Sequence, residues 1–304
     1  MITFMRMRLL KCLVLAALCS TQLLAQTNRP ATPDPKQLAD EKAKAAWGNT
    51  TAMYNVGCYY YYGQGVAKNY TTASQWLTKA ANKDNVEAML LLADIYDEGG
   101  PGIKADPARA VTWYKKAAEK GSADAAYELG EMYEFGNGVE KSMTEAVRWY
   151  REAANDGDGD AMIALGFCYM EGDGVPADKK TGYEWFIKAS EAGLPEAMRY
   201  LGDYYAQADM GNDCAKAIEW YMKAANAGDT QSIKPVGIMV MKDECGGADK
   251  GAVADWMKKL ADNNIADACF YMGGFYITGA GVAKKPRRGM EYLIRDREIG
   301  DYHG

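Results

Sequence analysis

The sequence predicts an all-α fold built from a tandem array of helical hairpins, and three observations support this prediction. Six tryptophans recur at intervals of 37, 36, 36, 35 and 36 residues, and Tyr292 takes the next step of 36. A small residue, a glycine and a tyrosine precede most of these positions at nearly constant offsets, and Gly-x-Gly divides most units into two halves. Seven copies in one register indicate a repeat protein. The tryptophans are Trp76, Trp113, Trp149, Trp185, Trp220 and Trp256.

The first half of each unit is predicted to be a helix with one packed face. Its small and apolar residues occupy positions one, two, five, six, eight and nine, which is helical spacing and not strand alternation. Position six is glycine in six of seven units, although glycine inside a helix costs roughly 1 kcal/mol relative to alanine. We therefore expect a neighbouring helix to approach closely there, with a ring laid over the gap. The position-six residues are Gly57, Ala93, Gly130, Gly166, Gly202, Gly237 and Gly273.

The second half of each unit is predicted to be a helix that carries the tryptophan and then an Ala-Ala pair, such as Ala153 and Ala154. Eight residues after the tryptophan comes a residue suited to the left-handed conformation that ends a helix, for which glycine is best and Asn or Asp are substitutes. These predicted helix ends are Asp84, Gly121, Gly157, Gly193, Gly228, Asn264 and Gly300.

The combined pattern A-x-x-x-L-G-x-x-Y-x-x-G-x-G-V, followed by A-x-x-W-Y-x-K-A-A-x-x-G, resembles the Sel1-like repeat family, which is related to the tetratricopeptide repeats. Residues 125–157 and 161–193 match it almost throughout, and the resemblance covers about residues 49–300. It implies an α/α superhelix, a right-handed solenoid of about seven repeats. It also implies a non-catalytic scaffold or adaptor that binds another protein or peptide, and many bacterial members are exported.

The N-terminus is predicted to be a secretory signal peptide over residues 1–25. Arg6, Arg8 and Lys11 precede a short apolar run, and cleavage is expected after Ala25. Lipidation at Cys19 is the alternative. Residues 26–35 are proline-rich and predict a linker, residues 36–48 predict a capping helix, and residues 301–304 are a tail. We thus expect an exported protein, periplasmic, extracellular or associated with the outer membrane, without a membrane span in the mature chain.

Charge and histidine content exclude several function classes. Without residues 1–25 the chain has 32 basic and 41 acidic residues, a net charge of −9, which argues against nucleic acid as a partner. The single histidine, His303, leaves no Ser-His-Asp or Cys-His arrangement, and we expect no cofactor and no metal site.

Two alternatives to a scaffold stay open: a cell-wall-related or β-lactam hydrolase, as described for some cysteine-rich Sel1-like proteins, and a glycan- or peptidoglycan-binding module. The paired cysteines of those relatives are absent here.

The sixth unit departs most from the pattern, with Ser232, Pro235 and Val240 at positions that elsewhere hold other residue types. The loops of the fifth and sixth units carry Cys214 and Cys245 and should be neighbours in the array. Export permits a disulfide between them, and two free thiols are the alternative. The other cysteines after the signal peptide lie on first helices, where we expect buried thiols: Cys58, Cys168 and Cys269.

A candidate binding surface remains after the repeat core is subtracted. Positions three, seven and ten of the first helices share one side of the helix and form what we call the stripe. Their residue types vary between units, which indicates slots without a structural role, and in related superhelices the first helices line the concave face. Aromatic anchors with an acidic rim suit a peptide ligand, bound here by a monomer. The alternative is ordinary helix packing and solvated surface. The candidate residues, with adjacent Tyr62, are Tyr54, Tyr61, Tyr62, Asp94, Tyr127, Glu131, Phe167, Met170 and Asp203.

Overall fold

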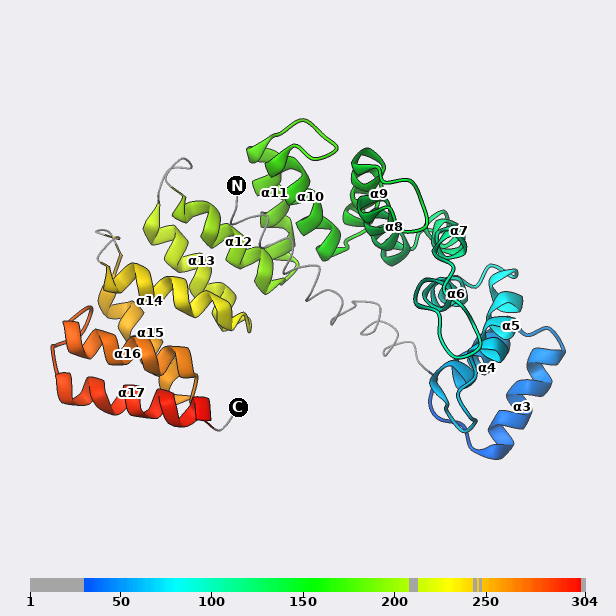
Figure 1. The fold of residues 1–304 in the computed structure, drawn as a ribbon, viewed down its shortest axis with the longest axis horizontal. Coiled ribbons are helices and arrows are strands. Elements are labelled where there is room, and N and C mark those ends of the chain that lie inside the picture. Colours follow the sequence, from blue (N-terminus) through cyan, green and yellow to red (C-terminus); the bar gives the residue numbers. More distant parts are fainter. Residues whose placement is uncertain (1–29, 208–212, 243–244, 246–247, 302–304) are drawn as a thin grey trace. The chain divides into compact units, whose positions relative to one another are not determined.

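The computed structural model describes residues 30–207, 213–242, 245 and 248–301 of the 304-residue chain. Within these residues the fold is all-helical apart from one isolated β-bridge, between Gly100 and Ile103, and this confirms the predicted fold class (Figure 1). The predicted signal peptide and His303 lie outside the described residues. The helices are α3 (Pro35–Ala46), α4 (Thr50–Tyr62), α5 (Tyr70–Ala81), α6 (Val86–Glu98), α7 (Pro107–Ala118), α8 (Ala123–Phe135), α9 (Met143–Asn155), α10 (Gly159–Glu171), α11 (Lys179–Glu191), α12 (Pro195–Ala206), α13 (Cys214–Asn226), η2 (Thr230–Ser232, a 3₁₀ turn), α14 (Ile233–Met241), α15 (Lys250–Asp262), α16 (Ala266–Thr278) and α17 (Pro286–Asp301).

Short polar residues start most of these helices. In each case a side-chain oxygen accepts a hydrogen bond from a backbone N–H of the first turn, which satisfies a donor that has no partner inside the helix. This explains why the hairpin boundaries follow Asn, Asp and Ser in the sequence. The capping residues are Asp34, Asn49, Asn69, Asn85, Asp106, Ser122, Ser142, Asp178, Asp213 and Asp249.

Five of the six glycines at position six pack against the second helix of their own hairpin, which confirms the predicted close approach. A Cβ added at Gly130 would overlap the ring of Tyr150, and one added at Gly166 would overlap the ring of Phe186. At Gly57 the covering side chain is Leu77. The residue that follows the tryptophan, and not the tryptophan itself, therefore fills the gap that glycine leaves.

The predicted helix ends between repeats are confirmed at six positions. Asp84 and Asn264 have φ of 65° and 62°, a left-handed conformation that is uncommon for residues other than glycine. The four glycines in the corresponding places also have positive φ: Gly121, Gly157, Gly193 and Gly228. The seventh prediction is wrong, because α17 continues through Gly300 to Asp301. No turn into a further helix interrupts the chain at that point.

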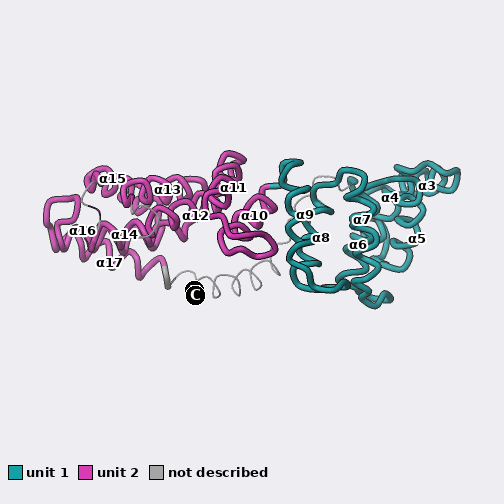
Figure 2. The backbone as a smooth tube through the Cα atoms, turned by 90° about the horizontal axis from the view of Figure 1, so that it is seen from above, with its two compact units in different colours: residues 1–158 teal, residues 159–304 magenta. Residues whose placement is uncertain are grey.

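Two compact units divide the array, the first ending at Asp158 and the second beginning at Gly159 (Figure 2). In unit 1, α3 packs on α4, and every helix from α4 to α8 contacts the next one in the chain. The segment before α3 is held in place as well. Pro33 is buried, and the Gln64 side chain donates a hydrogen bond to the backbone oxygen of Pro30 at 2.9 Å. The end of the proline-rich segment thus packs on the loop between α4 and α5.

Unit 2 contains three regular hairpins and one irregular interval. The pairs α10–α11, α12–α13 and α16–α17 pack like those of unit 1, but α14 contacts α13 and α16 and has little contact with α15. The ring of Tyr271, on α16, takes the place over Gly237 that a residue of the unit's own second helix takes elsewhere. The sixth unit, whose sequence departs most from the pattern, therefore lacks the packing of a regular repeat hairpin.

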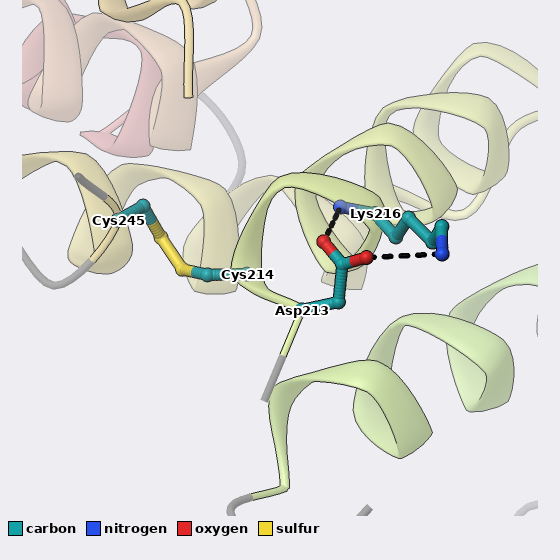
Figure 3. Close-up of a disulfide and its surroundings, with 4 residues drawn as sticks. All are labelled: Asp213, Cys214, Lys216 and Cys245. Atoms are coloured by element: carbon teal, nitrogen blue, oxygen red, sulfur yellow. Dashed lines mark hydrogen bonds and ion pairs between the residues drawn. A yellow bond between two sulfur atoms is a disulfide. The ribbon is translucent and has the colours of Figure 1, made fainter. Parts of the chain in front are cut away.

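A disulfide joins Cys214, at the start of α13, to Cys245, in the segment after α14 (Figure 3). The two Cα atoms are 5.4 Å apart, within the usual range for a disulfide. Beside it, Asp213 accepts hydrogen bonds from the backbone and side chain of Lys216, which fixes the start of α13. The bond therefore links the irregular interval to the preceding hairpin. The thiols of Cys58, Cys168 and Cys269 are buried, as expected.

Candidate interaction site

The first helices of unit 1 place their stripe residues on one surface. α4, α6 and α8 follow one another along one side of the unit, and α5, α7 and α9 follow along the other (Figure 1). α4 also contacts α6 directly. The candidate residues on these three helices are thereby brought together, whereas those on α10 and α12 belong to unit 2.

Three tyrosines form a half-buried cluster at the end of α4. The Tyr61 ring stacks on Tyr70 with centroids 5.1 Å apart and planes at 23°, and Tyr62 meets Tyr61 edge-on at 4.8 Å. The Lys68 ammonium lies 4.6 Å from the Tyr70 ring centroid and 5.7 Å from that of Tyr61. Tyr70 was not predicted as part of the site, and we call Tyr61, Tyr62 and Tyr70 the tyrosine cluster. Tyr54 is half-buried on the same helix, and burial raises its pKa.

Asp94 lies on α6 next to this cluster and has a strongly perturbed carboxyl group. The pKa of Asp94 is raised to about 7, mainly by burial, although a hydrogen bond from the Tyr114 hydroxyl at 2.7 Å lowers it and neighbouring carboxylates raise it. The Asp94 charge in turn helps burial to raise the pKa of Tyr61. The side chain therefore has two roles: it accepts a hydrogen bond inside its hairpin, and it adds negative charge to the surface that α4 and α6 share.

On α8, the structure separates the two predicted site residues. Glu131 is half-buried and belongs to the surface. Tyr127 is only 6% exposed, and its ring lies 5.7 Å from that of Tyr150 on α9. The prediction of Tyr127 as a docking anchor is therefore wrong, because position three of this helix turns toward the hairpin core.

In unit 2 the predicted site residues Phe167 and Met170 pack against neighbouring helices. The Phe167 ring meets Phe186 and Tyr200 edge-on, at 5.1 and 4.7 Å, and thus lies between α11 and α12. Met170 packs over Gly182, where an added Cβ would lie 2.7 Å from its Cγ. These contacts make Phe167 and Met170 part of the helix interfaces, so the expectation that stripe positions have no structural role is wrong for them.

Asp203, also in unit 2, accepts a hydrogen bond from the Tyr221 hydroxyl at 2.7 Å. Burial raises the pKa of Asp203, whereas Tyr221 and the nearby Arg199 lower it. An Arg199 guanidinium nitrogen lies 3.9 Å from the carboxylate, and its Nε lies 2.9 Å from Asp229. Asp203 therefore has both a hydroxyl donor and a cation within its own unit.

A relation between the two helices of each hairpin explains which stripe residues are acidic. Where the residue after the tryptophan is tyrosine, its hydroxyl donates to a stripe carboxylate: Tyr114 to Asp94, Tyr150 to Glu134 and Tyr221 to Asp203, at 2.7, 2.8 and 2.7 Å. Where that residue is apolar, stripe positions seven and ten carry no carboxylate. The apolar residues are Leu77, Phe186, Met257 and Leu293. This relation is visible in the amino-acid sequence when the stripe residues of each unit are compared with the residue that follows its tryptophan.

In five units a basic side chain of the second helix covers the ring of the tryptophan. In four units a lysine three residues after the tryptophan lies over the indole, with its ammonium 3.9–4.3 Å from the ring centroid. In the third unit Arg148 covers Trp149 at 4.1 Å. The lysine pairs are Lys79 with Trp76, Lys116 with Trp113, Lys188 with Trp185 and Lys223 with Trp220.

The described part of the chain holds no group of three or more His, Cys, Asp or Glu residues that could bind a metal ion. Over the same residues, every helix is too short or too polar to cross a bilayer. What the stripe face of unit 1 does offer is half-buried aromatic rings next to carboxylates, an arrangement that suits binding.

Stacked helical hairpins with a 36-residue register define a helical repeat protein. Six segments of the chain match the Sel1 repeat, and the chain belongs to this family: residues 50–85, 86–122, 123–158, 159–194, 195–229 and 266–295. The unmatched interval contains α14 and α15, the two helices that fail to form a hairpin. Sel1 repeat proteins are in general non-catalytic scaffolds that mediate protein–protein interactions.

Similar proteins include two from eukaryotes. A component of an ERAD-associated E3 ubiquitin-protein ligase, HRD3A of Arabidopsis thaliana, is 40% identical over 57 residues, and human protein sel-1 homolog 2 is 45% identical over 56 residues. Each match covers 18% of this chain and only 8% of the relative's length. These likenesses are therefore confined to about one and a half repeats.

Two solved structures are similar over longer stretches. The protective antigen c5321 of uropathogenic Escherichia coli, which has the SLR fold, is 32% identical with a TM-score of 0.71, over 87% of this chain and 56% of that one. A Sel1 repeat protein from Oxalobacter formigenes is 31% identical with a TM-score of 0.57, over 72% of this chain and 89% of that one. The solenoid architecture is thus shared with experimentally determined Sel1 repeat structures.

Proposed function

We propose that this protein is a non-catalytic scaffold that binds a segment of another protein through the stripe face of unit 1. The observation that carries the proposal is the proximity of the tyrosine cluster, on α4 and α5, to the α6 carboxylates Asp94 and Glu98. Large aromatic side chains supply contact area at low entropic cost, and charged groups around them supply specificity. Unit 1 is favoured over unit 2 because Phe167 and Met170 are already packed between helices.

We also propose that the protein acts outside the cytoplasm, in the periplasm or beyond. Two features support this location: the signal-peptide pattern of residues 1–25, and the bond between Cys214 and Cys245, because disulfides persist in oxidising compartments. The partner would then be another exported protein or a peptide, and the scaffold would act as a monomer.

Site-specific photocrosslinking in the native organism tests the proposed binding face. A benzophenone amino acid replaces Tyr62 on the stripe side of α4 in one variant, and Trp113 on α7 in the other. We expect a discrete crosslinked partner from position 62 and none from position 113. A partner captured only through position 113 would show that binding uses the second helices and would refute the proposed face.

A further inference from the structure

The tyrosine cluster occupies places where the other units carry no tyrosine. Tyr61 and Tyr62 end α4, and Tyr70 begins α5. In the other six units the corresponding places hold other residue types, of which only Phe135 on α8 is aromatic. Because those units form their helices without these rings, the repeat itself does not require the tyrosine cluster.

Tyr70 supports the rest of the cluster. Tyr61 stacks on its ring, and the backbone of Gly100, in the loop between α6 and α7, lies so close to this ring that an added Cβ would overlap it. The next residue of α5, Thr71, donates a hydrogen bond to the Gly102 carbonyl oxygen at 3.4 Å. Two neighbouring hairpins therefore fix Tyr70, and Tyr70 in turn fixes Tyr61, so a ligand meets rings that are already in place.

The cluster combines apolar ring surface with a hydroxyl that can donate a hydrogen bond. Tyr62 meets Tyr61 edge-on with planes at 87°, so the two half-buried rings form a corner. Among the described residues the Tyr61 hydroxyl has no hydrogen-bond partner, and its oxygen is not enclosed by protein. Proline-rich segments dock on aromatic side chains in this way, and the carbonyl groups of a polyproline II helix have no internal hydrogen bonds.

The loop that follows α4 already holds an extended, proline-containing stretch of the same chain. Residues 30–34 precede α3 without helical structure, and Asp34 has φ of −72° and ψ of 168°, close to polyproline II. Gln64, in this loop, donates a hydrogen bond to the Pro30 carbonyl oxygen at 2.9 Å, and Pro33 is buried. Donation to a prolyl carbonyl and packing of a proline ring are thus observed directly beside the tyrosine cluster.

We propose that the tyrosine cluster binds a proline-rich segment of the partner in the polyproline II conformation, with a proline ring against Tyr62 and a carbonyl oxygen accepting from the Tyr61 hydroxyl. This inference rests on the proposed function and names the chemistry of the partner. A short extended segment fits better than a helix, because a helix needs anchors over several turns and Tyr127 on α8 is buried in its hairpin. A proline-rich chain also loses little conformational entropy on binding, since polyproline II is preformed.

The test uses the whole chain without residues 1–25 and fluorescein-labelled decaproline, with binding followed by fluorescence anisotropy. We expect saturable binding of decaproline. A decapeptide of alternating glycine and serine, which is a flexible coil, should bind at least about tenfold more weakly. Raising sodium chloride from about 50 to about 500 mM should change the affinity for decaproline less than about twofold, because the proposed contacts contain no charge pair.

Two substitutions test the ring and the hydroxyl separately. Tyr62→Ala should weaken decaproline binding about tenfold, the loss typical of a central aromatic contact, and Tyr61→Phe about fivefold, the loss of one hydrogen bond. Phe135→Ala is the matched control, because this residue takes the place on α8 that Tyr62 takes on α4, is 55% exposed and lies outside the tyrosine cluster. It should change the affinity less than about twofold, and circular dichroism verifies that each variant is folded.

Absence of decaproline binding, or equal effects of Tyr62→Ala and Phe135→Ala, would refute the inference. Tighter binding of soluble peptidoglycan fragments than of decaproline would assign the rings to a glycan and refute it as well. Mass spectrometry of the partner crosslinked from position 62 separates this failure from that of the proposed function. A crosslinked segment without proline would leave the scaffold function standing and overturn the proline-rich ligand, whereas a crosslinked proline-rich segment would support both.

Discussion

At the scale of single residues, a tyrosine that follows a repeat tryptophan is paired with a carboxylate of the stripe. The tyrosine hydroxyl donates a hydrogen bond to that carboxylate. Three of the seven units have both members, and the other four lack both. A buried hydroxyl needs a hydrogen-bond partner, so a tyrosine in this place requires an acceptor on the facing helix. The acidic character of the stripe thus originates partly in the core, before any ligand is considered.

Tyr114→Phe should destabilise the protein by about 1–2 kcal/mol, because it leaves the Asp94 carboxylate without its donor in a desolvated place. Chemical denaturation monitored by circular dichroism measures the change. Tyr133→Phe is the matched control: this tyrosine is half-buried in the same unit and has no hydrogen-bonded hydroxyl among the described residues. Equal effects of the two substitutions would show that the hydrogen bond contributes little.

Glu128→Gln should stabilise the protein at alkaline pH. The folded-state pKa of Glu128 is raised, as is that of Asp94, so between about pH 4 and pH 8 the folded protein binds more protons than the unfolded chain. The free energy of unfolding therefore falls as pH rises through this window. Removing Glu128 removes part of that loss, and the variant should exceed wild type by on the order of 1–2 kcal/mol at pH 8.

The difference between Glu128→Gln and wild type should shrink toward pH 4.5, where Glu128 is protonated in the folded protein. Thermal melts at several pH values measure it, with Glu140→Gln as the control that should follow wild type throughout. A Glu128→Gln protein that is less stable than wild type at pH 8 would mean that the carboxylate makes a stabilising contact.

At the scale of helices, the features that depend on local backbone rules could be predicted from the sequence. The side-chain contacts between neighbouring helices could not. Helix ends at Asp84 and Asn264 follow from backbone conformation, and the position-six glycines follow from the cost of glycine in a helix. The burial of Tyr127 and the packing of Phe167 between helices depend on which side chains the neighbouring helices present, and the periodicity of the sequence does not contain this information. The residues at the stripe positions therefore vary between units mainly because each unit packs its helices with different side chains. Only part of this variation belongs to a binding surface.

The irregular sixth interval shows the same limit. Its departures at Ser232 and Pro235 were visible in the sequence, but their consequence was not. η2 occupies the start of the expected helix, and the shortened α14 packs on α16 and not on α15. The disulfide from Cys214 to Cys245 then provides a covalent link in a place where the usual hairpin contacts are missing.

Thiol labelling in denaturant tests the disulfide. For the chain without residues 1–25, iodoacetamide should modify three cysteines in the absence of reductant, Cys58, Cys168 and Cys269, and also the two bonded ones after reduction. Reduction should lower the free energy of unfolding by roughly 3–4 kcal/mol, from the entropy of closing a loop of this length. Five cysteines labelled without reductant would show that the bond is absent.

At the scale of the whole molecule, stability comes mainly from contacts between consecutive helices. In unit 1, the contacts run from α3 to α8 through successive neighbours, and α8 pairs with α9. In such arrays each repeat depends on its neighbours and not on the complete chain, so a part that keeps its internal interfaces can fold. Unit 1 keeps α3 packed against its first hairpin, and it contains both the tyrosine cluster and Asp94.

A fragment of residues 30–158 should therefore fold alone and retain the binding site. We expect a helical circular dichroism spectrum, a cooperative thermal transition at a lower temperature than that of the full chain, and capture of the same crosslinked partner from position 62, because unit 1 supplies the tyrosine cluster and Asp94. The same fragment with the benzophenone at position 113 is the control for site-specific binding. A fragment that folds but does not bind would place an essential part of the site in unit 2, whereas an unfolded fragment would show that unit 1 depends on the second unit for its stability.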